Sequence, residues 1–330
     1  MNSEQSDKIR IGTRKSSLAQ AQAQEIRKAI ESFFPDGKVE IHKIQTRGDR
    51  LVDRSLSKIG GKGLFLKEIQ QALFDDEIDI AVHSMKDVPA ERPDGLEICA
   101  VPRRKPAEDV LVSHGDVSLD NLPKNAIVGT SSLRRKSQLL AYRPDLVVKP
   151  LRGNINTRLN KLLQSDEFAA IILAKAGLIR AGLEGCISQE ISPEIILPGI
   201  GQGALAVEIK SDKNHLREKL NFLEDFKTRV EITAERQFLR TLEGSCHVPI
   251  GALAVLKNMG SNYTLTLDGV VASLNGAVVL KDQGIKHFSS SDLNYIEINY
   301  AASSLGKELA ASLIEQGAGK IIREAEEEVE

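Results

Sequence analysis

The side chains that could do chemistry lie in a few short polar segments, and one of these carries a thiol. Cys246 lies in the segment Gly244 to Pro249, a predicted loop between a helix end and a strand. Loops carry reactive side chains more often than cores do, so Cys246 is either a functional thiol or a packed loop cysteine, and spacing alone leaves both open. Adjacent side chains rarely face each other, which disfavours a protease-like pair with His247.

A carboxylate stands in the second segment. Asp87 follows the buried run Ile80 to Val82, and Pro89 discourages continuation of that strand. The carboxyl ends of strands line the ligand crevice in α/β sheets, so Asp87 could hold a cationic group and exchange protons. The alternative is a surface ion pair with the adjacent Lys86. We interpret His83 as a packed strand residue, because no partner His or Cys has metal-ligand spacing.

Two further segments of similar composition each stand where a predicted strand becomes a helix: GTRKSSL, residues 12–18, and GTSSLRR, residues 129–135. A helix N-terminus presents unpaired N–H groups and positive partial charge, which suit an anion. The serines either cap the helices or help to bind that anion. Two such segments, one in each half of the α/β region, favour a cleft that binds an anion from both sides. Their polar side chains include Arg14, Ser16, Thr130, Ser131 and Ser132.

Arginines cluster in and after the second of these segments. Arg134 and Arg135 fall in the first turn of a helix, where the helix dipole disfavours cations. We therefore expect them to bind a carboxylate, which a guanidinium can hold through two hydrogen bonds. Arg152 and Arg158 repeat the theme. Arg180 is a further candidate, with a solvated surface arginine as its alternative.

A glycine-rich segment, Ser57 to Phe65, contains Lys58 and Lys62. It does not match a nucleotide-binding P-loop, because no Ser or Thr follows Lys62 and no buried strand precedes it. The segment is either a mobile lid over an acidic ligand or a solvated surface loop.

Composition narrows the class of protein. A chain of 330 residues, 41% hydrophobic and 27% charged, is typical of a soluble globular protein with two or three domains. A net charge of −2 disfavours nucleic acid as a partner, so any basic site must be local. No apolar run could span a membrane, and residues 1–12 contain no apolar leader, so we expect a cytosolic protein. Three scattered cysteines support neither a disulfide framework nor a zinc site.

Alternating strand-like and helix-like segments over the first 200 residues predict an α/β fold with a largely parallel sheet. Ser16 or Ser17 should cap the first helix, and a later helix should begin near Ser132. The apolar face of the next helix is Ile155, Leu159, Leu162 and Leu163. The expected strands are 8–12, 39–45, 78–85, 96–101, 126–129, 169–174 and 204–209.

The region after about residue 225 reads as a small α+β domain. Val230, Ala234, Phe238 and Leu242 recur at helical spacing. The remaining expectations are strands at 250–256, 263–267 and 270–272, a hairpin turn at 275–276, a helix at 301–316 ended by Gly317, and a frayed acidic tail at 324–330.

Taken together and in this order, these segments resemble the porphobilinogen deaminase (hydroxymethylbilane synthase) family. The resemblance runs from Ile9 to about Arg323. It departs from the family pattern at Ser17, Lys175 and Ser245, none of which is a proposed catalytic group. It is densest in GTRKSSLAQAQ, TRGD, KIGGKGLF, IAVHSMKDVP, GTSSLRR, LRGNINTRL, PGIGQGA, AERQFLRTLEG and CHVPIGA.

The resemblance implies an α/β fold with two periplasmic-binding-protein-like domains around a cleft and a small α+β C-terminal domain. The first domain would comprise residues 1–104 and 200–224, and the second residues 105–199. Residues 225–330 would form the domain that bears the cofactor cysteine.

The resemblance also implies the activity. Four porphobilinogen molecules are joined head to tail, each losing ammonia, on a dipyrromethane cofactor attached to Cys246 by a thioether, and hydrolysis frees the linear hydroxymethylbilane. Asp87 would be the catalytic carboxylate that stabilises positive charge on the pyrrole. Each pyrrole carries two carboxylates, so the growing chain needs many cations.

The resemblance divides the remaining site residues between cofactor and substrate, with no metal and no nucleotide, in a cytosolic monomer. The expected cofactor-binding residues are Cys246, Lys86, Thr130, Ser131, Ser132, Arg134, Arg135 and Arg152. The expected substrate-binding residues are Arg14, Ser16, Lys58, Lys62, Arg158 and Arg180.

A two-lobed binding module for an anionic ligand is the competing interpretation. It would have a similar fold, but it leaves Cys246 and the C-terminal domain without a role. The absence of an apolar leader and of an N-terminal helix-turn-helix segment also disfavours it. Intact mass separates the two, since a binding module should match 36.1 kDa and a cofactor-loaded enzyme should be heavier.

Overall fold

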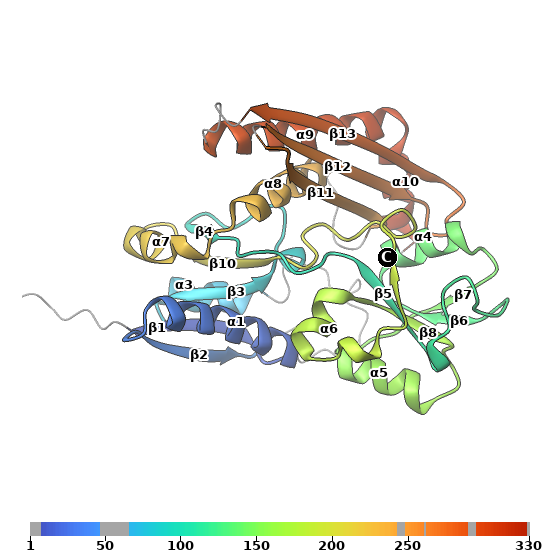
Figure 1. The fold of residues 1–330 in the computed structure, drawn as a ribbon, viewed down its shortest axis with the longest axis horizontal. Helices are drawn as coiled ribbons and strands as arrows, with labels where there is room; N and C mark the ends of the chain where they lie inside the picture. Colours follow the sequence, from blue (N-terminus) through green and yellow to red (C-terminus); the bar gives the residue numbers. More distant parts are fainter. Residues whose placement is uncertain (1–7, 47–65, 243–247, 261, 290–294, 329–330) are drawn as a thin grey trace, which may run out of the picture. The chain divides into compact units, whose positions relative to one another are not determined.

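Three β-sheets form in the part of the chain that the structure describes (Figure 1). Residue contacts divide the chain into two units, residues 1–103 with 205–225 and residues 104–204 with 226–330. The first unit holds one sheet and the second holds two. The predicted division into three domains stays a prediction. The computed structural model describes residues 8–46, 66–242, 248–260, 262–289 and 295–328.

The sheet of the first unit has five strands in the order β2-β1-β3-β10-β4. β1 pairs in parallel with β2 and β3, whereas β10 is antiparallel to β3 and β4. Four of the five strands therefore run in one direction, and the expectation of a largely parallel sheet is confirmed. The exception is β10, which enters beside the end of β3, with Leu205 opposite Ser84. The strands are β1 Lys8–Arg14, β2 Lys38–Ile44, β3 Ile80–Ser84, β4 Leu96–Ala100 and β10 Leu205–Lys210, and the helices are α1 Ser17–Phe33, α3 Lys67–Phe74 and α7 Asn214–Leu220.

The first sheet of the second unit repeats this pattern, in the order β7-β6-β8-β5-β9. β6 pairs in parallel with β7 and β8, and β5 is antiparallel to β8 and β9. In both sheets the antiparallel strand is the fourth, so both are mixed. The strands are β5 Asp109–Ser113, β6 Ile127–Gly129, β7 Val147–Lys149, β8 Ala170–Ala174 and β9 Gln189–Ile191, and the helices are α4 Leu133–Tyr142, α5 Ile155–Gln164 and α6 Lys175–Ala181.

The two similar sequence segments occupy equivalent places in these two sheets, where β1 leads to α1 and β6 leads to α4. The Ser16 hydroxyl accepts a hydrogen bond from the Ala19 N–H at 3.3 Å, and the Ser132 hydroxyl accepts one from the Arg135 N–H at 3.4 Å. Both predicted caps are confirmed.

The apolar face of α5 is narrower than expected. Leu159 and Leu162 are buried, but Leu163 is 66% exposed. One position past Leu162 lies about 100° around the helix, which turns Leu163 away from the sheet.

The third sheet is antiparallel, in the order β11-β12-β13, and α8, α9 and α10 pack against it (Figure 1). The expected break between residues 267 and 270 is wrong, because Asp268 and Gly269 stay paired with Leu253 and Ala252 in one continuous strand. Gly276 adopts φ 72° in the turn that follows, as its predicted place in a hairpin requires. The strands are β11 Ile250–Asn258, β12 Asn262–Ala272 and β13 Val279–Ser289, and the helices are α8 Phe226–Thr241, α9 Tyr295–Glu315 and α10 Ala318–Glu327.

The acidic tail is helical as far as Glu327, so the expected fraying is wrong over residues 324–327. Ile321, Ile322 and Ala325 recur on one face of α10 and are buried in the core of this sheet or against it. Apolar burial fixes the helix, and the glutamates occupy its other face.

Glu235 of α8 is a buried carboxylate. Its hydrogen bonds connect the third sheet with the chain at Arg104 and at Gly201, before and after the five-stranded sheet of this unit. Glu235 accepts hydrogen bonds from Arg104 Nη1 at 2.6 Å, from the Gly201 N–H at 2.7 Å and from the Ala254 N–H at 3.0 Å. A fully buried carboxylate needs such partners, because an unpaired one costs several kcal/mol.

The helices α8 and α9 approach closely at Gly306. A Cβ atom at this position would lie 2.3 Å from the Ala234 carbonyl oxygen and 2.9 Å from the Phe238 nitrogen. Both neighbours are helix backbone and cannot move aside, so only glycine permits this approach.

Replacing Gly306 by Ala should therefore destabilise the protein by about 1–3 kcal/mol through overpacking. Gly319 of α10 is the matched control, since its Cβ would meet nothing closer than 3.6 Å. Gly319→Ala should be neutral or stabilise by up to about 1 kcal/mol, because alanine favours a helix. Denaturant unfolding measures both, and equal effects of the two substitutions would contradict the close approach.

Candidate functional site

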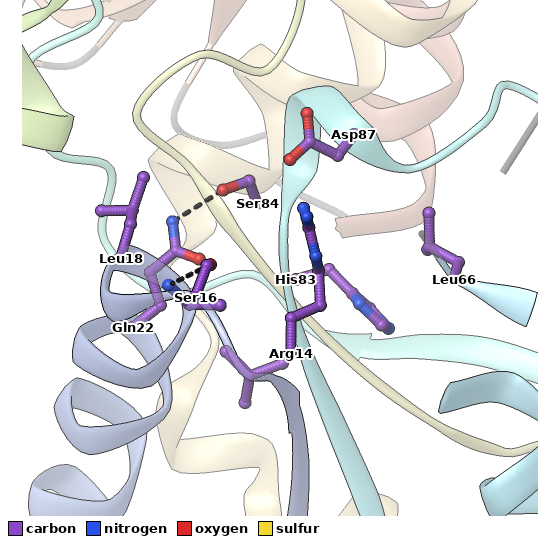
Figure 2. Close-up of a pocket in the computed structure, with 10 residues that line it drawn as sticks. Arg14, Ser16, Leu18, Gln22, Leu66, His83, Ser84 and Asp87 are labelled. Carbon is purple, nitrogen blue, oxygen red and sulfur yellow. Dashed lines mark hydrogen bonds between the residues drawn. The ribbon is translucent and has the colours of Figure 1, made fainter. Parts of the chain in front are cut away.

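A polar pocket lies at the carboxyl ends of β1 and β3 in the first unit (Figure 2). The ends of parallel strands meet at one edge of a sheet, which explains why residues far apart in sequence converge here. The pocket is lined by Arg14, Ser16, Leu18, Ala19, Gln22, Leu66, Val82, His83, Ser84 and Asp87.

Hydrogen bonds hold the two sides of this pocket together. The Gln22 side-chain amide donates to the Ser84 hydroxyl at 2.6 Å, which joins α1 to the end of β3. The Thr13 hydroxyl donates to the Ala19 carbonyl oxygen at 3.0 Å, which fixes the start of α1 against β1. The polar lining is therefore held by the scaffold, as a preorganised site requires.

Asp87 is exposed and lies on a short 3-10 helix, Met85–Asp87, that follows β3 directly. The Arg14 side chain points from the end of β1 toward Asp87 in Figure 2. The predicted position of Asp87 at the end of a buried strand is thus correct. Lys86 lies on the same turn and is exposed, but it does not line the pocket.

A buried ionic cluster lies in the second unit around Asp109, the first residue of β5. Arg134 Nη1 lies 2.8 Å from Asp109 Oδ2, and Arg135 Nη2 lies 2.8 Å from Oδ1. The Gln202 amide also donates to Asp109 at 2.8 Å. Burial raises the pKa of Asp109, but the charges of Arg134 and Arg135 outweigh it and hold the pKa below its ordinary value. The arginines that we expected to bind a ligand carboxylate thus have an internal carboxylate partner as well.

Positive charge nevertheless exceeds negative charge in this cluster. Arg158 donates from Nε to the Gly153 carbonyl oxygen at 2.8 Å, and no ion pair of Arg158 is found among the described residues. Burial, and then the charge of Arg135, lower the pKa of Arg158 to about 10. The Nε of Arg135 is buried and finds no hydrogen-bond partner among the described residues. Such a group of guanidinium ions suits an anionic ligand.

Most of the other candidate site residues of this unit form hydrogen bonds with groups other than Asp109. The hydroxyl of Ser131 donates to the Leu151 carbonyl oxygen at 2.9 Å, and that of Thr130 accepts from the Ser132 N–H at 3.2 Å. Arg180 donates to the Gly203 carbonyl oxygen at 3.1 Å, and Arg152 is exposed. Three candidates lie outside the described residues: Lys58, Lys62 and Cys246.

Sequence reasoning missed Asp109, Gln22 and Glu208. Asp109 carried a recognisable signal, since a charged residue opening the apolar run 110–112 must find a partner when that strand is buried. His83 is buried in β3, as predicted, with Nε2 3.1 Å from Glu208 Oε2. Over the described ranges, no group of three His, Cys, Asp or Glu side chains could hold a metal ion, and no helix is long and apolar enough to cross a bilayer.

Comparison with known protein families shows to which family the chain belongs. A model described as "Porphobilinogen deaminase, dipyromethane cofactor binding domain" matches residues 9–218, and one described as "Porphobilinogen deaminase, C-terminal domain" matches residues 229–315. The chain belongs to the porphobilinogen deaminase family.

Curated porphobilinogen deaminases match nearly the whole chain. The protein from Natranaerobius thermophilus is 53% identical over 97% of this chain and 99% of its own length. The protein from Brevibacillus brevis is 48% identical over 96% of this chain and 97% of its own. Porphobilinogen deaminases are enzymes of tetrapyrrole synthesis, so the activity inferred from the sequence is confirmed at the level of the family.

Solved structures of periplasmic binding proteins are also similar. The aliphatic sulphonate binding protein SsuA from Escherichia coli is 14% identical, with a TM-score of 0.38 over 72% of this chain and 71% of that chain. A Salmonella typhimurium periplasmic binding protein with high arginine specificity is 14% identical, with a TM-score of 0.38 over 66% of this chain and 91% of that chain. Family membership rests on the sequence matches and not on these superpositions.

The described residues fit the dipyrromethane cofactor of a porphobilinogen deaminase. The cofactor carries acetate and propionate groups, so its site needs cations in excess of the protein's own carboxylates. Arg134 and Arg135, with Arg158 beside Arg135, have such an excess of positive charge over Asp109, and the buried Nε of Arg135 has no hydrogen-bond partner among the described residues. The cluster lies within the span that matches the cofactor-binding family model.

Removing the charge of Asp109 should destabilise the protein strongly. Asp109→Asn leaves Arg134 and Arg135 buried without their carboxylate, and breaking a buried pair costs about 3–5 kcal/mol. The matched control is Asp145→Asn, which breaks a partly exposed pair with Arg143 and should cost about 1 kcal/mol or less. Urea unfolding measures both.

The pH dependence of the protein's stability follows from the lowered pKa of Asp109. A carboxylate with a lowered pKa stabilises the fold above its unfolded pKa of about 4, and the effect is lost as pH falls through the lower folded value. The stability gap between wild type and Asp109→Asn should therefore stay constant from pH 7 to 5. A gap that closes within this range would mean that Asp109 is not held ionised.

Proposed function

We propose that the chain is a transferase that condenses four porphobilinogen molecules head to tail, with loss of ammonia at each step, and then releases linear hydroxymethylbilane by hydrolysis. The observation that supports this most is the exposed carboxylate of Asp87 in a polar pocket of a porphobilinogen deaminase. Asp87 is held where a buried strand ends, with Arg14 pointing toward it.

Asp87 acts as the catalytic carboxylate of this reaction. As ammonia leaves the aminomethyl carbon of porphobilinogen, positive charge develops on the pyrrole ring. A fixed anion beside that ring stabilises the charge, and it can also accept the proton that the pyrrole loses when the new carbon–carbon bond forms. Ser84 and Gln22 hold the adjacent backbone and helix in place through their hydrogen bond.

The cations bind the carboxylates of the ligands. Arg14 and Ser16 bind substrate in the first unit, whereas Arg134, Arg135 and Arg158 bind carboxylates in the second, supported by their excess charge. Lys86, Arg152, Arg180 and the hydroxyls of Thr130, Ser131 and Ser132 extend this set. Lys58 and Lys62 complete the substrate-binding set.

Cys246 is the attachment point of the cofactor, through a thioether that resists hydrolysis. When bound, the dipyrromethane supplies the pyrrole carbon on which the new chain is built. We place the enzyme in the cytosol as a monomer. The cytosol fits Cys99 and Cys186, neither of which forms a disulfide among the described residues. Light scattering of the purified protein tests the monomer.

The charge of Asp87 should matter more than its shape. Asp87→Asn should slow single-turnover ammonia release about 10²–10³-fold, since it removes the anion that the developing cation needs. Asp87→Glu keeps the charge one methylene away and should retain more activity. The control is Asp94→Asn, an exposed carboxylate in the segment between β3 and β4, which should leave the rate unchanged. An Asp87→Asn enzyme as fast as wild type would make the carboxylate structural.

Cys246→Ala should remove the cofactor without unfolding the protein. Intact mass of the wild type should exceed 36.1 kDa by two pyrrole units, and that of the variant should match the bare chain. Cys186→Ala is the control and should keep the added mass. Added mass on the Cys246→Ala protein would assign attachment to another residue, and a bare wild-type mass after incubation with porphobilinogen would favour a binding module.

A further inference from the structure

A buried carboxylate lies behind the pocket, and the proposed mechanism does not use it. Glu208 of β10 is fully buried. His83 Nε2 lies 3.1 Å from Glu208 Oε2, and the Gln70 amide donates to Oε1 at 3.2 Å. Among the described residues no Lys or Arg lies within ion-pair distance of Glu208. Burying a carboxylate without a cationic partner costs free energy of folding, so we expect the cluster of Glu208, His83 and Gln70 to have a function.

The cluster joins three separate elements of the first unit. His83 stands in β3, Glu208 in β10 and Gln70 in α3. His83 pairs with Ala206 across the two strands, so Glu208 is its diagonal neighbour on the same face of the sheet. The hydrogen bond therefore forms only in this register, and a slip of one residue would move Glu208 to the opposite face.

The register that this hydrogen bond requires is also the one that places the end of β3 at the pocket. The pairing of β3 with β10 stops at Ser84 and Leu205, and the turn that carries Asp87 begins at the next residue, Met85. On the other side of the cluster, Gln70 holds α3, and Leu66, the residue before α3, lines the pocket. His83 lines the pocket as well, whereas Glu208 does not.

We propose that Glu208 is a positioning residue of the reaction, which acts through His83 and Gln70 to hold β3 and α3 where they present Asp87 and Leu66 to the pocket. The inference rests on the proposed catalytic role of Asp87. Glu208 touches no substrate, so its removal should lower kcat and change KM little, because the reacting carboxylate is displaced while the ligand-binding side chains remain.

The test compares two buried glutamates in the cofactor-loaded enzyme. Glu208→Gln keeps the volume and removes the charge. Glu231→Gln is the matched control, because Glu231 of α8 is also buried and accepts a hydrogen bond from the Leu256 N–H, far in sequence from the pocket residues. Both substitutions should lower the melting temperature. Only Glu208→Gln should lower kcat, by about ten- to a hundred-fold, with KM changed less than about threefold.

Two measurements separate positioning from a merely structural role. In an Asp87→Asn background, Glu208→Gln should cause little further loss of kcat, since the group that it positions is already gone. Amide hydrogen exchange at Val88, whose N–H is bonded to the Met85 carbonyl oxygen at 3.1 Å, should speed up in Glu208→Gln and not in Glu231→Gln. Additive losses of kcat, or an unchanged exchange rate, would overturn the proposal.

The outcomes also separate this inference from the proposed function. If Asp87→Asn has no effect on the rate, the proposed role of Asp87 fails first. If Asp87→Asn is slow but Glu208→Gln matches Glu231→Gln in kcat, only the inference fails. Should Glu208→Gln not fold, Gln70→Met removes both hydrogen bonds of Gln70 to the same carboxylate at similar volume, and wild-type kcat in that variant would overturn the proposal.

Discussion

The cost of burying a carboxylate without a partner constrains this structure more than any other single factor. Asp109, Glu208 and Glu235 are each completely buried, and each draws its partners from elements distant in sequence. The cost of leaving any of them unpaired, several kcal/mol, is a large part of the stability of an ordinary domain. The three carboxylates therefore specify which elements meet, whereas apolar packing alone would tolerate several arrangements.

The two α/β sheets share one pattern of strand directions but present different chemistry at the same place. At the ends of β1 and β3 of the first unit lie Arg14, Ser16 and the Asp87 turn, which line a pocket with an exposed anion. After β6 of the second unit comes α4, whose first turn carries Arg134 and Arg135. In the proposed mechanism, a repeated scaffold thus supports a carboxylate for the reacting pyrrole in one unit and cations for ligand carboxylates in the other.

Local signals made much of this predictable from the sequence. The caps at Ser16 and Ser132, the strand before Asp87 and the arginines of α4 are each specified by residues within a few positions of one another. The insertion of β10 beside β3 and the pairing of Asp109 with α4 were not predicted, because partners that lie tens of residues or more apart leave no periodic trace. Likewise, Asp268-Gly269 resembles a turn, and only pairing on both sides keeps β12 continuous. The proposed roles of Cys246, Lys58 and Lys62 rest on sequence resemblance alone.

The position of β10 has a consequence for the order in which the chain can fold during synthesis. The five-stranded sheet of the second unit is built from the contiguous stretch Asp109 to Ile191, but the sheet of the first unit lacks its fourth strand until Lys210 has been made. A ribosome adding about 5–20 residues per second needs about 5–20 s to make the hundred residues between β4 and β10. During that time the edge of β3 that will pair with β10 exposes unpaired N–H and C=O groups, which another chain could bind, so this edge is a site where a chaperone would protect the nascent chain.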